Sequence, residues 1–398
     1  MLIRQLKQEE FDERIALSEF AFQYKLPEDR REEERRYFRP ERVWGVFDDR
    51  DRLLSALTLL PLEIYIEGRV MRMGGLAGVA SWPEARRGGN VTKLLVRALE
   101  EMREQGQTIS MLHPFQFAFY RKYGWEFTIE RKRYEIDMAL LVKRKETAGR
   151  IERVPAEAGN LEAIYNRFAS RYNGTLVRSE EWWRRRIFSK KGTAAVWRNT
   201  NGIPEGYIYY VVENRLLTIY DWACVGEESR AALWSFIANH DSMADRIELV
   251  APTDDSLSFL MPNPRFKQEI VPYFMSRIVD LEALASLYPF RPGDREEQLV
   301  LEVRDEYAPW NDGRFRLVFG EDGAGRVAEA NRKGGSATAL SGGEPDISCD
   351  IRTLTAMLLG NRRPEWLREV GLLAGSAEAV SLLERRIPVR PSFLADFF

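Results

Sequence analysis

The sequence predicts a mixed α/β protein in which two copies of one α/β unit precede a small α+β domain. Three observations lead to this prediction: the length of 398 residues, a repeated order of predicted strands and helices, and a change of pattern near residue 290. A chain of this length exceeds one typical core. Its hydrophobic fraction of 44% is that of an ordinary globular protein, so packed cores are expected.

The first unit, predicted for residues 1–148, combines a strand meander with helices. Apolar alternation and turn residues predict the strands, and an apolar repeat of period 3.6 predicts the helix that follows Pro83. That helix ends near Gly106. The predicted elements are a strand at 2–6, a helix at 10–22, strands at 43–49, 53–66 and 67–81, the helix after Pro83, a strand at 109–114, a helical turn at 115–124 and a strand at 133–140.

The second unit, predicted for residues 149–288, repeats this order after a polar stretch at 143–155. Its predicted elements are helices at 158–172 and 179–188, strands at 193–199, 205–213 and 215–225, a helix at 227–241 and a strand at 246–252. We interpret the repeated order as an internal duplication whose second copy has diverged.

The third region, predicted for residues 289–398, has the size of a small domain. Residues 296–319 alternate like two paired strands around an Asn-Asp-Gly turn. Residues 348–360 lead into a helix that Gly360 ends, and a further helix and the stretch "PVRPSFLADFF" complete the chain.

Composition and charge exclude several classes of function. Fifty-nine Lys and Arg residues against 61 Asp and Glu residues leave a net charge of −2, which gives no electrostatic reason to bind nucleic acid. The charged run at 27–42 alternates in sign, as a solvated helix face does. Two distant cysteines and two histidines suggest neither a metal site nor a disulfide framework. No signal peptide or apolar run of membrane-spanning length is visible, so we expect a cytoplasmic protein without a membrane partner.

The stretch "WPEARRGGNVTKLL" at 82–95 is the first candidate site. A helix start has unpaired N–H groups and a positive dipole end, glycines allow close approach of the backbone, and arginines add charge-assisted contacts. The pattern therefore suits phosphate, although it is neither a Walker loop nor a dinucleotide fingerprint. The alternative is an ordinary turn with two exposed arginines. The second unit has "WACVGEESRAALWSF" at the equivalent place, without the paired arginines and glycines, which favours an anion site in the first unit only.

The spacing of Arg86, Gly89 and Val91 between a strand and a helix resembles the acetyl-CoA loop of GNAT-superfamily acetyltransferases. Over the whole chain the resemblance is to the Eis (enhanced intracellular survival) family, which joins an active GNAT domain, a degenerate GNAT domain and a sterol-carrier-protein-like domain. Its motifs are "GGLAGVASWPEARRGGNVTKLL", "SMLHPFQFAFYRKYGWEF", "PYFMSRIVDLEAL", "LTAMLLGNRRPEWL" and "PSFLADFF". Val91 is a departure, since the family usually has Gly or Ala there.

The resemblance implies acetyl-CoA-dependent N-acetylation of amine-rich small molecules such as aminoglycosides, and it implies a homo-hexamer. It assigns Tyr120 as general acid and the free carboxylate of Phe398 as base. The cofactor-binding residues that it implies are Val79, Ser81, Arg86, Arg87, Gly88, Gly89, Asn90 and Val91.

Elementary chemistry agrees with the two catalytic roles. A positioned phenol can protonate a leaving thiolate, and an α-carboxylate with a pKa of roughly 3.5 is ionised at neutral pH and can accept a proton from an amine. The alternatives are a packing role for Tyr120 and an apolar tail that merely docks in a groove. An apolar tail must dock somewhere, and docking would fix the position of the Phe398 carboxylate.

Aromatic residues near the predicted first helix are candidates for the acceptor pocket, namely Phe22 and Tyr24 together with Phe20. Asp396, two residues before the terminus, is a further candidate for binding the acceptor. Two other functions stay open at this point. The chain could acetylate protein lysines, or its third domain could bind a lipid or another apolar ligand while the GNAT part serves as a scaffold.

Overall fold

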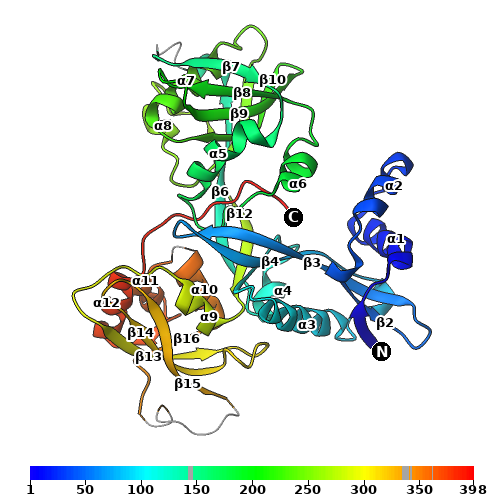
Figure 1. Cartoon of the computed structure of the whole chain (residues 1–398), viewed down its shortest axis with the longest axis vertical. Helices are drawn as coiled ribbons and strands as arrows, with labels where there is room; N and C mark the ends of the chain where they lie inside the picture. Colours follow the sequence, from blue (N-terminus) through cyan, green and yellow to red (C-terminus); the bar gives the residue numbers. More distant parts are fainter. Residues whose placement is uncertain (142–146, 334–339, 341–342, 361) are drawn as a thin grey trace.

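The computed structural model describes residues 1–141, 147–333, 340, 343–360 and 362–398. The two α/β units and the third region form three lobes, and the last residues of the chain run back from the third lobe to a point between the first two (Figure 1). The fold is mixed α and β throughout, as predicted. None of the helices among the described residues is long and apolar enough to span a bilayer.

The first unit follows the predicted order closely. Its elements are β1 (Leu2–Gln5), α1 (Phe11–Phe22), α2 (Glu28–Tyr37), β2 (Val43–Phe47), β3 (Leu53–Ile66), β4 (Arg69–Ser81), α3 (Asn90–Glu104), β5 (Ile109–Leu112), α4 (Phe117–Lys122) and β6 (Glu126–Asp137). Helix α2 is the charged run, and it buries no residue. Helix α3 buries Leu94, Leu95, Ala98, Leu99 and Met102, the apolar face that the period of 3.6 predicted.

The second unit repeats the pattern with one more strand at each end than the sequence indicated. Its elements are β7 (Arg150–Val154), α5 (Ala158–Ala169), α6 (Glu180–Trp182) continued by a π-helical turn (Trp183–Ile187), β8 (Thr193–Arg198), β9 (Pro204–Glu213), β10 (Leu216–Cys224), α7 (Glu227–Ala238), β11 (Arg246–Ala251), α8 (Leu257–Leu260) and β12 (Lys267–Ile278). Part of the stretch predicted as a polar linker is thus strand β7. This strand lies at the edge of the sheet, where polar and charged residues are common. Residues 142–146 of that stretch lie outside the described residues.

One sheet joins the two units. Its strand order is β1-β2-β3-β4-β5-β12-β6-β11-β10-β9-β8-β7. Strand β12 is inserted between β5 and β6, antiparallel to both. Strand β6 in turn pairs with β11 of the second unit. The two units therefore share a backbone hydrogen-bond network, and their relative position is fixed by it.

The third region is a sheet of order β15-β14-β13-β16-β17 covered by helices. Helix α9 (Leu281–Leu287) lies just before the predicted start of this region at residue 289 and packs against its strand β15. The elements of the region itself are β13 (Glu297–Arg304), β14 (Gly313–Phe319), β15 (Gly325–Arg332), β16 (Ile347–Asp350), α10 (Ile351–Leu359), α11 (Pro364–Glu369), β17 (Ala374–Gly375) and α12 (Ala377–Arg386). β13 and β14 pair as predicted, but their connection is longer than an Asn-Asp-Gly turn. Asp305 holds the start of this longer connection in place. It forms a 2.7 Å ion pair with the buried Arg277 and accepts a hydrogen bond from the amide of Ala308.

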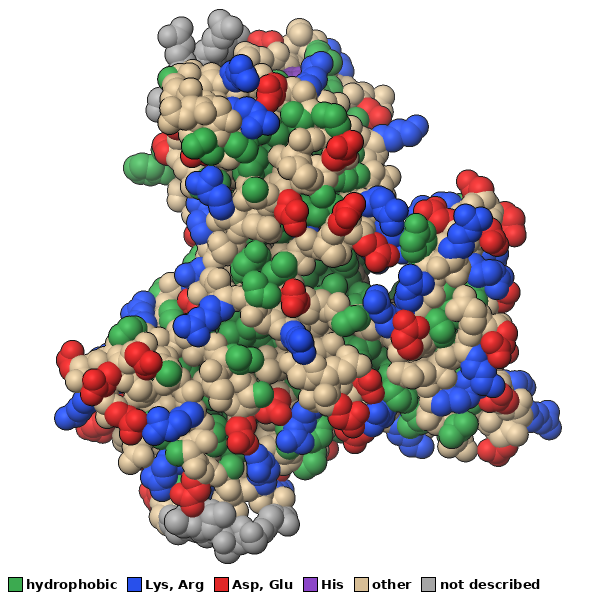
Figure 2. Space-filling model, in the orientation of Figure 1, with side chains coloured by type: hydrophobic (Ala, Val, Ile, Leu, Met, Phe, Trp, Pro, Cys, Tyr) green, Lys and Arg blue, Asp and Glu red, His purple; other side chains and the backbone are tan. Residues whose placement is uncertain are grey.

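The surface carries both signs of charge. Over the face seen in Figure 2, Lys and Arg side chains alternate with Asp and Glu side chains, and a recess separates the second unit from the lobe that holds α1 and α2. An ion pair of 3.1 Å between Arg185 and Glu34 links α2 to the π-helical turn across this recess.

Candidate active site

The inner edge of β4 is unpaired over its last residues. β4 pairs with β3 as far as Ser81, whereas its parallel pairing with β5 ends at Leu76 and Leu112. Residues 77–81 therefore have a neighbouring strand on one side only. Val79 and Ser81, both predicted to bind the cofactor, lie in this segment. A free strand edge can accept an extended ligand as an added strand.

A β-bulge shapes the same segment. Ala56 is opposite Ala80 and Thr58 is opposite Ala77, so Gly78 and Val79 together face one residue of β3. Gly78 has a φ of 57°, and a Cβ atom there would lie 2.3 Å from a guanidinium nitrogen of Arg14. The bulge therefore requires glycine.

Arg14 of α1 packs against the bulge and is hydrogen-bonded to it. Its side chain is buried and donates a 3.0 Å hydrogen bond to the carbonyl of Gly78. It also contacts the hydroxyls of Ser18 and Thr58. These partners are all uncharged, and burial lowers the pKa of Arg14 to about 10. Sequence analysis did not single out Arg14 or the bulge, although a glycine inside a strand is the ordinary signal for one.

The predicted phosphate loop lies at the start of α3. Gly89 is the N-cap with a φ of 77°, and Arg87 also has a positive φ of 65°. Arg86 through Gly89 are exposed, and within the described residues neither arginine forms a salt bridge. The first N–H groups of a helix lack intrahelical acceptors, and the helix dipole is positive there. Exposed amides and cations of this kind suit an anion.

Charge at the helix start distinguishes the two units. The first turn of α3 contains no acidic residue. Its counterpart α7 has Glu227 and Glu228 in the first turn, and these carboxylates already neutralise the dipole and repel phosphate. Asn90 adds a second feature to α3, because its buried Oδ1 atom has no hydrogen-bond partner among the described residues, while its Nδ2 donates to the carbonyl of Ala85.

Tyr120 of α4 is buried where β4 and β5 stop pairing. Its ring lies 5.1 Å from that of Phe119 and 6.4 Å from that of Trp125, in the apolar cluster that includes Leu76 and Leu112. Burial raises the pKa of Tyr120 well above its usual value, so the phenol is neutral and can donate a proton. No hydrogen bond among the described residues uses its hydroxyl, in contrast to the Tyr123 hydroxyl, which lies 2.7 Å from that of Thr92.

The C-terminal residue reaches the same strand. The Phe398 side chain is 6% exposed, and its ring lies 4.8 Å from that of Phe274. A Cβ atom on Gly75 of β4 would lie 2.9 Å from this ring. Gly75 immediately precedes Leu76, the last residue that pairs with β5. The structure therefore brings the ring of residue 398 to Gly75 of β4, next to the last residue of the β4–β5 pairing, in a different apolar cluster from the one that holds Tyr120.

Asp396 is occupied by contacts within the chain. Its buried carboxylate accepts hydrogen bonds from Arg178 at 2.9 Å and from the indole of Trp182 at 2.7 Å. Its backbone carbonyl accepts from the Tyr273 hydroxyl at 2.8 Å. These contacts support a role in anchoring the chain end more than direct contact with an acceptor, and the predicted substrate role stays a prediction.

The aromatic candidates of the first unit lie near the end of α1. Tyr24, Phe20 and Trp82 line an open pocket of about 600 Å³ with Glu19. The rings of Phe20 and Trp82 are 5.1 Å apart. Phe22 is 51% exposed and is not among the described residues that line this pocket. The pocket thus includes Tyr24 and Phe20 of the three predicted aromatic residues.

Comparison with known proteins agrees with this architecture. An acetyltransferase (GNAT) domain model matches residues 2–128, a second acetyltransferase (GNAT) domain model matches residues 174–278, and a sterol carrier protein domain model matches residues 281–395. The first unit and its diverged copy are therefore both of GNAT type. The fold and the site define an acetyl-CoA-dependent N-acetyltransferase.

Several individual proteins resemble this chain in sequence or in fold. The chain is 25% identical over 325 residues to N-acetyltransferase Eis of Mycobacterium tuberculosis, which covers 77% of this chain and 76% of that protein. A probable N-acyltransferase from Enterococcus faecalis is 28% identical, with a TM-score of 0.88 over 100% of this chain and 99% of that one. Eis1 from Mycobacterium abscessus shares the fold at 22% identity, with a TM-score of 0.78 over 100% of both chains. The chain thus resembles the Eis N-acetyltransferases in sequence, and its two GNAT domains and sterol-carrier-like third domain occur in one chain.

Proposed function

We propose that the chain acetylates amine-rich small molecules, such as aminoglycosides, by direct transfer from acetyl-CoA in a ternary complex at the first unit. The observation that carries the proposal is the unpaired edge of β4, and two further features near this strand support it: Tyr120 is buried in the cluster that includes Leu76, and the ring of the buried Phe398 reaches Gly75. We also propose domain boundaries at 148/149 and 288/289, a homo-hexamer and a cytoplasmic location.

The residues present fit acetyl-CoA. The backbone of Val79 and Ser81 on the free edge of β4 would hold the pantetheine arm, and the Ser81 side chain does not compete because its hydroxyl lies 2.6 Å from that of Ser55. The amides from Arg87 to Val91 and the cations of Arg86 and Arg87 would hold the pyrophosphate. Val91 in place of a smaller residue changes no backbone donor, since each residue of this loop supplies its own N–H.

Acetyl-CoA supplies the activated acetyl group, and the chain supplies the proton transfers. The carboxylate of Phe398 would accept the proton that the acceptor amine must lose before it attacks. The Tyr120 hydroxyl would donate the proton that the departing sulfur takes up, and its raised pKa keeps that proton in place at neutral pH. Direct transfer needs no nucleophile from the chain, and burial raises the pKa of the Cys224 thiol to about 11, so that this cysteine is a poor nucleophile.

The acceptor would enter from the recess between α1–α2 and the second unit. Tyr24, Phe20 and Trp82 offer aromatic faces to an organic amine, and cations bind well to such faces. Tyr24 is exposed at the pocket, whereas Phe22 would contribute only if an acceptor extends beyond it.

The experiment is thiol release from acetyl-CoA with three acceptors offered separately: an aminoglycoside, an aliphatic polyamine and a lysine-containing peptide. We expect thiol release with the aminoglycoside or the polyamine, and mass spectrometry should show an increase of one acetyl group per amine modified. Release with the peptide alone would instead support the protein-lysine alternative. No release with any amine, together with a ligand extracted by organic solvent, would support the lipid-binding alternative and contradict the proposal.

A further inference from the structure

The second unit keeps the strand geometry of a transferase site without its acetyl-CoA loop. β10 pairs with β11 in parallel only from Leu216 to Thr218, just as β4 pairs only briefly with β5. β10 also has a bulge, because Ile219 is opposite Tyr210 and Asp221 is opposite Tyr209, which leaves Tyr220 as the extra residue. A bulge of this kind changes the direction of a side chain and is common next to binding sites. The residues that lie against this part of β10 therefore matter for its function.

The C-terminal segment of the chain occupies this place. A cavity of about 280 Å³ is lined by residues 218–222 of β10, by residues 248–250 of β11 and by Phe393 and Ala395 of the terminal segment. The segment is held there by its backbone: the amide of Asn173 donates to the carbonyl of Pro391, and the amide of Phe393 donates to the carbonyl of Asn173, both at 3.0 Å. The second unit thus binds the chain's own end where a transferase would bind its ligands.

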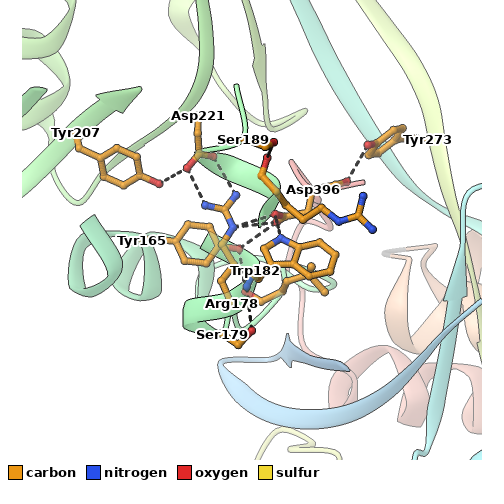
Figure 3. A network of polar contacts seen from close by, with 11 residues as sticks. Tyr165, Arg178, Ser179, Trp182, Ser189, Tyr207, Asp221, Tyr273 and Asp396 are labelled. Atoms are coloured by element: carbon orange, nitrogen blue, oxygen red, sulfur yellow. Dashed lines mark hydrogen bonds and ion pairs between the residues drawn. The ribbon is translucent and has the colours of Figure 1, made fainter. Parts of the chain in front are cut away.

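Asp221 at the bulge connects this cavity to the chain end through one arginine. Both carboxylate oxygens of Asp221 accept from the guanidinium of Arg178, at 2.7 and 3.0 Å. The Nε atom of Arg178 donates to Asp396 at 2.9 Å (Figure 3). All three side chains are buried, and the Tyr207 hydroxyl donates a further hydrogen bond of 2.5 Å to the Asp221 carboxylate. A buried arginine shared between two carboxylates has a fixed geometry, because any loose arrangement would leave a charge unpaired.

The fixed point lies two residues from the terminus. The backbone carbonyl of Asp396 is held by Tyr273 of β12, and its carboxylate is held by Arg178 and Trp182 (Figure 3). Phe397 is 56% exposed and spans the gap to the buried Phe398. An anchor this close leaves the terminal residue little freedom, so the position of Asp396 sets where residue 398 meets β4.

We propose that the second unit is the receptor for the C-terminal segment, and that Arg178 and Asp221 are positioning residues that act through Asp396 to place the terminal carboxylate at the first unit. The proposal rests on the proposed catalytic role of the Phe398 carboxylate. It gives the unit without an acetyl-CoA loop a function in the reaction of the other unit. In this role neither Arg178 nor Asp221 would need to contact acetyl-CoA or the acceptor.

Two readouts test the proposal in the full-length protein: the rate at which carboxypeptidase removes Phe398, and kcat with KM for acetyl-CoA. Asp396→Asn should speed removal of Phe398 by about tenfold, because proteolysis follows the population of the released end. It should lower kcat by roughly tenfold to a hundredfold with KM for acetyl-CoA unchanged, as a misplaced catalytic group does. Asp255→Asn is the matched control, since Asp255 of the second unit also accepts from a tyrosine, Tyr134 of β6, and has no hydrogen bond to the chain end among the described residues.

A triple variant, Arg178→Gln with Asp221→Asn and Asp396→Asn, removes all three charges together and keeps the test available if a single variant does not fold. Faster removal of Phe398 with a lower kcat in a folded variant would support the proposal. Faster removal with unchanged kcat would keep the receptor and refute the catalytic role of the Phe398 carboxylate. Unchanged removal and unchanged kcat in the folded triple variant would overturn the receptor.

Discussion

Replacing Tyr120 by Phe removes one hydroxyl and leaves the packing of the ring intact. The ring keeps its contacts with Phe119 and Trp125, and the hydroxyl has no hydrogen-bond partner among the described residues. The free energy of unfolding should therefore change by less than about 0.5 kcal/mol. If the hydroxyl is the general acid, kcat should fall roughly a hundredfold, which corresponds to about 2.7 kcal/mol of activation free energy.

Tyr123→Phe is the matched control for Tyr120→Phe. Tyr123 lies in the same aromatic cluster, but its hydroxyl is hydrogen-bonded to Thr92 at 2.7 Å. Loss of this hydroxyl should cost about 1 kcal/mol of stability and leave kcat close to the wild-type value.

The assay is initial-rate thiol release together with thermal unfolding of both variants. A kcat of Tyr120→Phe within about twofold of wild type would refute the general-acid role, because general acids contribute far more than that. The raised pKa of Tyr120 can be checked in the pH profile of kcat. If wild-type activity falls as pH rises at values well below 10, and this fall is absent in Tyr120→Phe, the raised pKa is contradicted.

Further predictions concern the loop, the terminus and pH. Arg86→Ala combined with Arg87→Ala should raise KM for acetyl-CoA by about thirtyfold at low salt, since each exposed charge-assisted contact is worth about 1 kcal/mol, and an unchanged KM would remove the loop from the site. One glycine added after Phe398 moves the carboxylate and should lower kcat roughly a hundredfold while calorimetry shows unchanged acetyl-CoA affinity. Burial, with a contribution from Arg131, lowers the pKa of His113 from 6.5 in the folded state, so the unfolded state binds the proton more readily. The free energy of unfolding should therefore fall as pH drops below 6.5, and thermal melts of His113→Gln should show a weaker fall.

Local patterns predicted the elements that form the proposed acetyl-CoA side of the site. The apolar repeat of α3 and the alternation of β3 and β4 are properties of neighbouring residues, so they can be read without the fold. The contrast between the loop after β4 and the stretch before α7 was likewise visible in the sequence. The structure adds a physical reason for it in Glu227 and Glu228 at the start of α7.

Pairings between distant segments were not predictable from local patterns. β12 was missed because its place between β5 and β6 depends on residues more than a hundred positions away. Arg178, Asp221 and Asp396 were missed as a group because they are separated by 43 and 218 positions. Asp221 and Asp396 each stand alone among apolar neighbours, and this is the signal that could have found them, since an isolated charge in a buried segment needs a partner. Arg178 gives no such signal, because Ser179 and Glu180 follow it.

The binding stoichiometry of acetyl-CoA tests the central claim most directly. That claim is that only the first of the two GNAT units keeps an acetyl-CoA site. Calorimetric titration of the intact protein should give one acetyl-CoA per chain, and the combined Arg86→Ala and Arg87→Ala variant should weaken this one site. Two sites per chain, or one site whose affinity does not respond to the loop substitutions, would contradict the account.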